Sequence, residues 1–282
     1  MSCFRIVLIL LMLWPAAGSH AANGPPVIRV GMTPAFLHDQ HSMLAEWRLY
    51  LQTRLKRPVE FVQRDSYRET MDLIQQQKIE FAWVCDYPYL ALRKEVRLLA
   101  VAMYQGKPSY RSYLIVPSAD MQTKAITDLR GAVFAFADPY SNTGYLAPRY
   151  ALKQAGTDPA RFFRRTFFTR SHRKAIESVA SGLAQGAAVD SYVWDSLARV
   201  RPELTARTRV VQKSEEYGFP PIVAHRSVSE GDFAAFQSVL LGMGNDPAGL
   251  AILAKLNLDG FIAGSPQLYT GVADMMRAFG EY

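Results

Sequence analysis

The sequence is poor in cysteine, with only Cys3 and Cys85 among its 282 residues. Cys3 lies in an N-terminal segment that we expect to be removed, so one thiol remains and no disulfide can form within the mature chain. Cys85 follows the apolar residues 81–84. Two interpretations of it stay open: a small buried hydrophobic side chain, or a thiol that takes part in a site.

Long hydrophobic runs are lacking as well. Ile6–Trp14 is an apolar run of about nine residues, whereas a helix that crosses a bilayer needs about 20. Arg5 precedes this run, and the small residues Ser19 and Ala21 follow it at the spacing that a signal peptidase reads. We therefore assign residues 1–22 to a secretory signal peptide. The mature protein is expected to be exported to the periplasm and to be soluble and monomeric.

Positive charge is present but is not concentrated. The formal net charge is +7, and the densest basic groups are Arg164-Arg165 and the residues Arg170, Arg173 and Lys174. A nucleic-acid-binding protein presents a basic stripe together with an element that reads the bases. The scattered charge therefore argues against a nucleic-acid partner. It favours a protein that binds small anions, or one that simply has a basic surface.

Motifs of common hydrolases are missing. There is no Gly-x-Ser-x-Gly elbow and no His-Glu-x-x-His sequence, which argues against an exported phosphatase or esterase. His38 and His41 flank Asp39 in a loop, but without a further ligand nearby this is not a zinc pattern. We expect no metal and no cofactor, and we expect this loop, with Phe36 and His38, to line the mouth of a ligand cleft.

Hydrophobic periodicity alternates between strand and helix along the chain, which predicts an α/β fold. Strands are expected at 27–32, 59–62, 81–84, 98–104, 110–116, 133–137, 163–168, 187–189 and 209–211, and helices at 43–55 (with Ser42 as its cap), 67–78, 145–155, 171–183, 191–200, 232–242, 247–256 and 267–279.

Two α/β blocks of similar size follow each other, and the C-terminal part returns to the first. This predicts two lobes, each a mixed sheet flanked by helices, joined by two extended hinge crossings near 113–118 and 213–221. We place the first lobe at 23–115, the second at 116–215, and the return to the first lobe with the C-terminal helices at 216–282. A cleft between such lobes is a natural site for a small molecule.

One stretch combines the features of an anion site. The strand at 133–137 ends at Asp138, and a helix follows the sequence Ser141-Asn142-Thr143-Gly144. The first turn of a helix leaves backbone N–H groups without partners. These can be capped by a small polar side chain, or they can be shared with a bound anion. A plain N-cap on a surface helix and an anion-binding turn both fit this stretch taken alone.

Nearly the whole mature chain resembles the periplasmic solute-binding proteins of the phosphate, phosphite and phosphonate uptake family, which are type II two-lobe proteins that serve ABC importers. The resemblance is carried by these segments: Gly31-x-Thr33-Pro34, Phe81-Ala82-Trp83-Val84-Cys85-x-Tyr87-Pro88-Tyr89, Asp138-Pro139-x-Ser141-x-Thr143-Gly144-Tyr145, Ser171-His172, Asp190-Ser191-Tyr192 and Pro220-Pro221.

The resemblance implies that Ser141, Asn142 and Thr143 grip an oxyanion, with Gly144 in the same turn. It also implies that His172 helps from a second helix start, that Tyr87 supplies an aromatic contact, and that Asp190 accepts a proton from the ligand or from its amino group. Two alternatives stay open here: Asp190 as the cap of the helix at 191–200, and His172 as a surface residue at a helix start.

This chain departs from the family at two positions. The family usually has Thr or Ser where Asn142 stands, and it often has a neutral residue where Asp86 stands. A carboxylate beside a doubly charged anion costs energy unless Asp86 points away or is paired.

The expected function is capture of phosphonate, phosphite or phosphate for the permease of an ABC importer. The alternative is an oxyanion sensor for a membrane histidine kinase, since some relatives sense arsenite with a cysteine in the cleft. In that case Cys85 would bind As(III).

Overall fold

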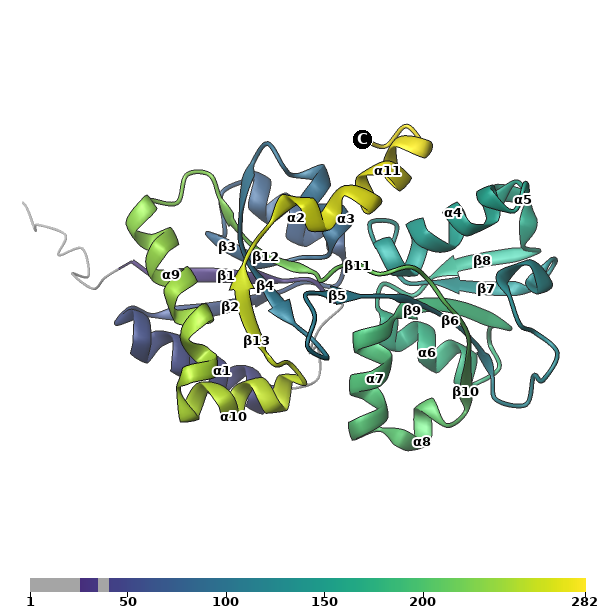
Figure 1. The fold of residues 1–282 in the computed structure, drawn as a ribbon, viewed down its shortest axis with the longest axis horizontal. Helices are drawn as coiled ribbons and strands as arrows, with labels where there is room; N and C mark the ends of the chain where they lie inside the picture. Colours follow the sequence, from purple (N-terminus) through teal and green to yellow (C-terminus); the bar gives the residue numbers. More distant parts are fainter. Residues whose placement is uncertain (1–25, 35–40) are drawn as a thin grey trace, which may run out of the picture.

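The computed structural model describes residues 26–34 and 41–282, with the side chain of His41 left out. The signal peptide predicted at 1–22 and the predicted ligand contacts Phe36 and His38 lie outside the described residues. The described chain forms two large sheets, one in each of two lobes that lie side by side, and a two-stranded sheet between them (Figure 1).

The first lobe is built on a six-stranded sheet that mixes parallel and antiparallel pairs. Its strands are, in spatial order, β13 (Gly260–Ala263), β4 (Val96–Met103), β12 (Pro221–His225), β3 (Phe81–Trp83), β1 (Ile28–Met32) and β2 (Val59–Gln63). Its helices are α1 (His41–Leu55), α2 (Tyr67–Gln75), α3 (Asp86–Ala91), α9 (Glu230–Gly242), α10 (Pro247–Leu256) and α11 (Thr270–Ala278). β1 pairs in parallel with β2 and β3, while β12 and β13 run antiparallel to their neighbours.

The second lobe is built on a five-stranded sheet, and helices lie on both of its faces (Figure 1). Its strands are, in spatial order, β10 (Thr208–Lys213), β6 (Ser112–Pro117), β9 (Gly186–Asp190), β7 (Val133–Phe136) and β8 (Arg165–Phe168). Its helices are α4 (Ala147–Gln154), α5 (Pro159–Phe162), α6 (His172–Ala180), α7 (Ser191–Val200) and α8 (Pro202–Thr205). All five residues of β9 are buried, as expected for a strand covered on both faces.

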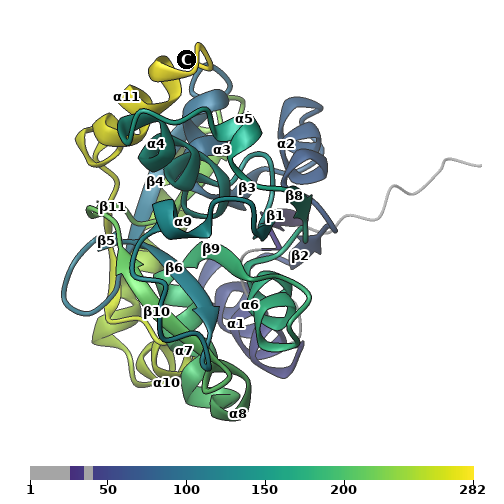
Figure 2. The same ribbon diagram turned by 90° about the vertical axis from the view of Figure 1, so that its right-hand side faces the viewer.

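The two crossings between the lobes pair with each other. β5 (Ser109–Tyr110) and β11 (Tyr217–Gly218) form a two-stranded antiparallel ribbon between the sheets. Figures 1 and 2 show this ribbon where the chain leaves β4 for β6 and where it returns from β10 to β12. The predicted α/β fold, with two lobes of mixed sheet and helix and two extended crossings, is confirmed.

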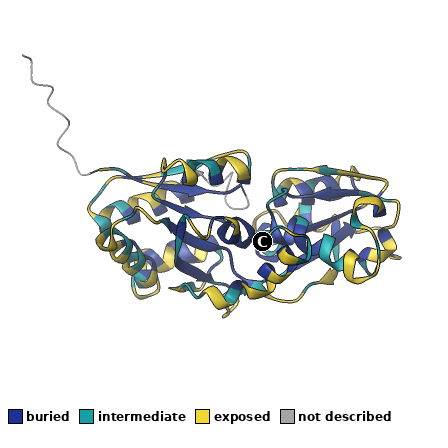
Figure 3. Ribbon diagram, turned by 90° about the horizontal axis from the view of Figure 1, so that it is seen from above, coloured by how far each residue is buried: buried dark blue, intermediate teal, exposed yellow. Residues whose placement is uncertain are grey.

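Each lobe has its own aromatic core, which Figure 3 shows as buried strands under more exposed helices. In the first lobe the rings of Phe81 and Phe236 stack with centroids 4.2 Å apart. In the second lobe Phe134 and Phe163 stack at 4.3 Å. Burial of such large rings supplies much of the driving force for folding.

All the predicted helices are present, but some of their ends differ by a few residues. Helix α6 ends at Ala180 rather than at 183, and α9 begins at Glu230 rather than at 232. Helix α1 already includes His41, so Ser42 lies inside the first turn, and the prediction that Ser42 caps this helix is wrong. Within the described residues, no helix combines the length and the apolar character needed to span a membrane.

Candidate functional site

The turn after β7 is buried rather than on the surface. Ser141 is the N-cap of a π-helical turn, Asn142–Leu146, that leads into α4, and its Oγ accepts the N–H of Gly144 at 3.0 Å. The side chains of Ser141, Asn142 and Thr143 are fully buried. A plain cap on a solvent-exposed helix therefore does not describe this turn.

Gly144 is required by close packing in this turn. A Cβ atom at this position would lie 2.4 Å from Cβ of Ala137 and 2.9 Å from Cε1 of His172. Such contacts are far inside the van der Waals distance, so the His172 ring reaches the turn only because residue 144 has no side chain.

His172 begins α6 and faces this turn. Its Nδ1 accepts the backbone N–H of Asp190 at 3.1 Å, and its Nε2 lies 3.3 Å from Ser141 Oγ. Because Nδ1 is an acceptor, the proton of the neutral ring lies on Nε2. Burial lowers the pKa of His172 to about 3, so the ring is a neutral donor at physiological pH. His172 is fully buried, which excludes the alternative that it is a surface residue.

Asp190 ends β9 and caps α7. Its Oδ1 accepts the backbone N–H groups of Tyr192 at 2.8 Å and Val193 at 3.3 Å. Burial raises the pKa of Asp190 to about 8, with a further contribution from the charge of Asp86. Capping occupies one oxygen of the Asp190 carboxyl group and leaves the other without a capping bond.

Asp86 from the first lobe meets the turn of the second lobe. Its Oδ1 accepts hydrogen bonds from the Tyr110 hydroxyl at 3.0 Å, the Cys85 thiol at 2.9 Å and the Tyr87 backbone N–H at 3.0 Å. Its Oδ2 accepts from Asn142 Nδ2 at 2.8 Å. Burial raises the pKa of Asp86 to about 6, and the donors around it oppose that rise. The carboxylate is thus fully buried but well paired.

Cys85 is buried beside this carboxylate. Burial, followed by the charge of Asp86, raises the pKa of the Cys85 thiol well above its usual value. The thiolate is the form that binds soft centres. This environment favours the first interpretation of Cys85, an inert buried thiol.

Three buried hydroxyls lack a hydrogen-bond partner in the described part of the chain, Thr70 Oγ1 among them. The other two are Tyr67 Oη at the start of α2 and Thr143 Oγ1 in the turn. Burial raises the pKa of Tyr67 well above its usual value, with further contributions from Cys85, Asp138 and Asp190, while the Ser141 hydroxyl opposes the rise. The Tyr67 hydroxyl therefore lies in this polar cluster. Buried hydroxyls are normally paired. These two groups are therefore available as donors to a bound molecule.

The cluster offers hydrogen-bond donors but no buried, fixed positive charge. Among residues 26–34 and 42–282, no Lys or Arg side chain is buried. Donors come instead from hydroxyls, the neutral ring of His172 and the backbone at helix starts, whose dipoles favour negative charge.

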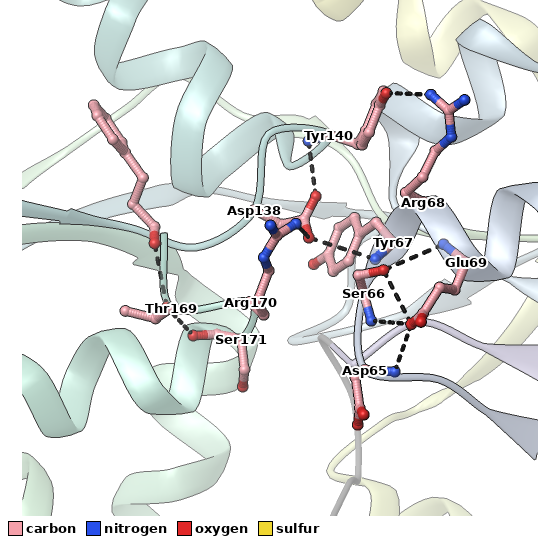
Figure 4. A network of polar contacts seen from close by, with 11 residues as sticks. Asp65, Ser66, Tyr67, Arg68, Glu69, Asp138, Tyr140, Thr169, Arg170 and Ser171 are labelled. Atoms are coloured by element: carbon pink, nitrogen blue, oxygen red, sulfur yellow. Dashed lines mark hydrogen bonds and ion pairs between the residues drawn. The ribbon is translucent and has the colours of Figure 1, made fainter. Parts of the chain in front are cut away.

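Contacts between the lobes surround the cluster, as Figure 4 shows. Asp138 of the second lobe accepts the backbone N–H of Tyr67 at 3.4 Å and that of Tyr140 at 2.9 Å. Arg68 donates to the Tyr140 hydroxyl at 2.8 Å. In Figure 4 the Tyr67 ring leaves α2 and points toward the loop that carries Asp138. The start of one lobe's helix is thus bonded to the other lobe.

Tyr87 lies at the edge of this region. Its hydroxyl donates to Glu281 at 3.2 Å and its ring contacts that of Tyr140 edge-on, with centroids 5.9 Å apart. Glu281 also pairs with Arg149 of α4 at 3.0 Å. Tyr87 therefore joins the C-terminus to both lobes, and its hydroxyl is engaged by protein.

The structure brings together most of the residues predicted from sequence. Around one buried point lie Ser141, Asn142, Thr143, Gly144, His172, Asp190 and Cys85, and only Tyr87 among the described candidates is directed elsewhere. Sequence reasoning did not include Tyr67 and Tyr110 in the site. The sequence does contain a pattern that marks the position of Tyr67. Tyr67 directly follows Ser66, which forms a capping box with Glu69, and a capping box predicts the start of a helix.

A cavity of about 490 Å³ lies elsewhere, between α4, β10 and α11. Lys213, Glu216 and Asp274 line it, and none of the predicted site residues does. Within the described ranges, no group of three or more His, Cys, Asp or Glu side chains could hold a metal ion.

Comparison with known proteins agrees with this geometry. Residues 30–269 match the family described as ABC transporter, phosphonate, periplasmic substrate-binding protein. The chain is 21% identical to the probable ABC transporter phosphite binding protein PhnD1 of Prochlorococcus marinus (strain MIT 9301), over 94% of each chain. It is 24% identical to the phosphonates-binding periplasmic protein of Escherichia coli (strain K12), over 88% of this chain and 75% of that protein.

The fold has a close counterpart among solved structures. The structure of Prochlorococcus marinus PhnD1 in complex with methylphosphonate superposes with a TM-score of 0.83 at 20% identity, covering 91% of this chain and 99% of that one. These findings support the importer interpretation over the sensor alternative and over an enzyme. The chain belongs to the periplasmic phosphonate-binding family of ABC-transporter substrate-binding proteins, and it is a binding protein rather than an enzyme.

Proposed function

We propose that this chain binds a small phosphorus oxyanion (phosphonate, phosphite or phosphate) between its lobes and delivers it to the permease of an ABC importer. The observation that carries the proposal is the pair of buried hydroxyls of Tyr67 and Thr143 that have no hydrogen-bond partner among the described residues, together with the Nε2–H of His172, which faces Ser141. A tetrahedral oxyanion offers several acceptor oxygens to such donors.

The proposed contacts come from both lobes. Ser141 Oγ accepts from Gly144, so its own hydrogen is free to donate. Thr143 and the backbone of the π-helical turn add donors from the second lobe, and Tyr67 adds one from the first. Asp190 accepts a proton from the ligand or from an amino group on it. We retain Phe36 and His38 as contacts at the cleft mouth.

We further propose that the protein reaches the periplasm through a signal peptide at 1–22 and acts as a monomer. The lobes are proposed to be 23–115 with 216–282, and 116–215. The pairing of β5 with β11 supports placing the first crossing a few residues earlier, at 109–110. A hinge of two paired strands lets the lobes open and close around a ligand.

Isothermal titration of the ligand-free protein with methylphosphonate, phosphite and phosphate tests the proposal. At least one should bind, and Thr143→Val should weaken binding about tenfold or more because it removes a buried donor while keeping the side-chain shape. The matched control is Thr53→Val, an exposed residue of α1, which should bind as the parent does. If none of the three anions binds, the proposed ligand class is wrong.

A further inference from the structure

The buried carboxylate of Asp86 is bonded to both lobes in a defined orientation. Its Oδ1 receives three donors, from Tyr110, Cys85 and the backbone of Tyr87, and its Oδ2 receives the amide of Asn142. Asp86 and Asn142 are fully buried. The pair therefore joins α3 of the first lobe to the anion-binding turn of the second.

This bond determines which way the Asn142 amide faces. With Nδ2 donating to the carboxylate at 2.8 Å, the carbonyl Oδ1 of Asn142 must face elsewhere. A flipped amide would place two acceptor oxygens against each other at that distance, which is unfavourable. In the described part of the chain, Oδ1 of Asn142 is buried and has no hydrogen-bond donor.

We propose that Asp86 is a specificity-determining residue: by holding the amide of Asn142, it presents Asn142 Oδ1 to the bound oxyanion as an acceptor. The cleft then favours an oxyanion that carries its own proton, such as a phosphonate monoanion with a P–OH group. It disfavours an anion of similar shape that lacks a proton, such as a sulfonate. This inference rests on the proposed function and refines the class of ligand.

The carboxylates near the cluster also favour an anion that is protonated and singly charged. Asp86 and Asp190 both face the cluster, together with the neutral groups Cys85, Tyr110 and His172. A doubly charged anion would meet one or two carboxylates and, among the described residues, no buried Lys or Arg. A singly charged, protonated anion reduces the repulsion and supplies the hydrogen that Asn142 Oδ1 needs.

The variant Asp86→Asn isolates this effect. Three donors converge on the Oδ1 position, so the oxygen of the new amide must occupy it, and the NH2 group must replace Oδ2. Asn142 then has to turn its carbonyl toward residue 86 and its own NH2 toward the ligand. The group that Asn142 presents to the ligand thus changes from an acceptor to a donor, and the side chain at position 86 keeps nearly the same volume.

The experiment compares methylphosphonate with methanesulfonate by titration calorimetry, at a pH slightly above the Asp86 pKa of about 6, where Asp86 is ionised and both ligands are mainly monoanions. The parent protein should prefer methylphosphonate by about tenfold or more, since the sulfonate leaves a buried acceptor unpaired. Asp86→Asn should reduce this preference about tenfold, mainly by improving sulfonate binding. The exposed Asp274→Asn should leave it unchanged.

The outcomes separate the two proposals. If the parent does not bind methylphosphonate, both the proposed function for this ligand and this inference are wrong. If the parent binds methylphosphonate but Asp86→Asn keeps the parental preference, only the role of Asp86 is overturned. Should Asp86→Asn not fold, Asn142→Ala decides, because it removes the acceptor and must also lower the preference. If both variants fold and bind neither anion, Asp86 and Asn142 support binding in general, and their proposed role in selectivity is wrong.

Discussion

The backbone N–H of Asp190 donates to Nδ1 of His172 at 3.1 Å. This single bond joins the end of β9 to the start of α6 and fixes the ring as the tautomer with its proton on Nε2. The Nε2–H then faces Ser141 at 3.3 Å. The turn proposed to bind the anion thus receives a neutral hydrogen-bond donor, where a protonated histidine would have supplied a positive charge.

The role of His172 can be tested by removing that donor. His172→Ala should weaken methylphosphonate binding about tenfold or more, because it removes a buried donor and leaves the Asp190 N–H without its acceptor. His172→Gln, which can keep a donor near the Nε2 position, should recover part of the loss. Titration calorimetry measures both.

The pH dependence of the affinity ratio between the parent and His172→Ala tests whether the His172 ring is neutral or charged when the ligand binds. The pKa of His172 is lowered to about 3, so the ring stays neutral across pH 5 to 8. The ratio of parental to His172→Ala affinity should therefore be constant over that range. A ratio that falls steeply as pH rises past about 6.5, the ordinary pKa of histidine, would show that His172 binds as a cation.

Gly144 should not tolerate a side chain. In Gly144→Ala the new Cβ would lie 2.4 Å from Ala137 Cβ and 2.9 Å from the His172 ring, so the turn or α6 must shift. We expect a loss of about 1–3 kcal/mol of stability and loss of methylphosphonate binding. Gly271→Ala, on α11 with open space around it, is the control and should stabilise the helix slightly. If Gly144→Ala and Gly271→Ala have the same Tm in thermal unfolding, the packing argument is wrong.

Asp190→Asn should stabilise the ligand-free protein, and more so at higher pH. The folded pKa of Asp190 is about 8 and the unfolded value is about 3.9, so between these values the folded protein holds more protons. Stability from Asp190 is therefore lost as pH rises through this window, whereas Asn does not titrate and still caps α7. By pH 8 we expect a gain of about 2–4 °C in Tm, and little gain at pH 4. A gain that is the same at both pH values would show that charge burial is not its cause.

Tyr67→Phe should separate binding from stability. The Tyr67 hydroxyl is buried without a partner among the described residues, so its removal should keep or raise the Tm of the ligand-free protein while weakening methylphosphonate binding about tenfold. The control is Tyr269→Phe, because the buried Tyr269 hydroxyl donates to the Phe219 carbonyl at 2.9 Å. That variant should lose stability and keep its affinity. Unchanged affinity in Tyr67→Phe would remove Tyr67 from the proposed site.

The sequence by itself determined the α/β class, the two lobes and the turn at 141–144. These depend on local rules: alternation of strand and helix periods, and small polar residues at a helix start. For the same reason it predicted the helix starts at His172 and Asp190. Cap formation at Asp190 is equally local, because an Asp before a helix accepts the free N–H groups of the first turn.

Only the tertiary structure decided which groups meet. Tyr67 and Asp138 are far apart in the chain and come together because the lobes face each other, and no periodicity encodes that contact. The pairing of Asp86 with Asn142 depends on the distance between the two lobes, and the tautomer of His172 depends on the distance between β9 and α6 of one lobe. Which buried hydroxyls have no partner among the described residues depends likewise on how separate elements pack. Hydrogen-bond geometry is set by how whole elements pack, so it cannot be inferred from the residues of one element alone.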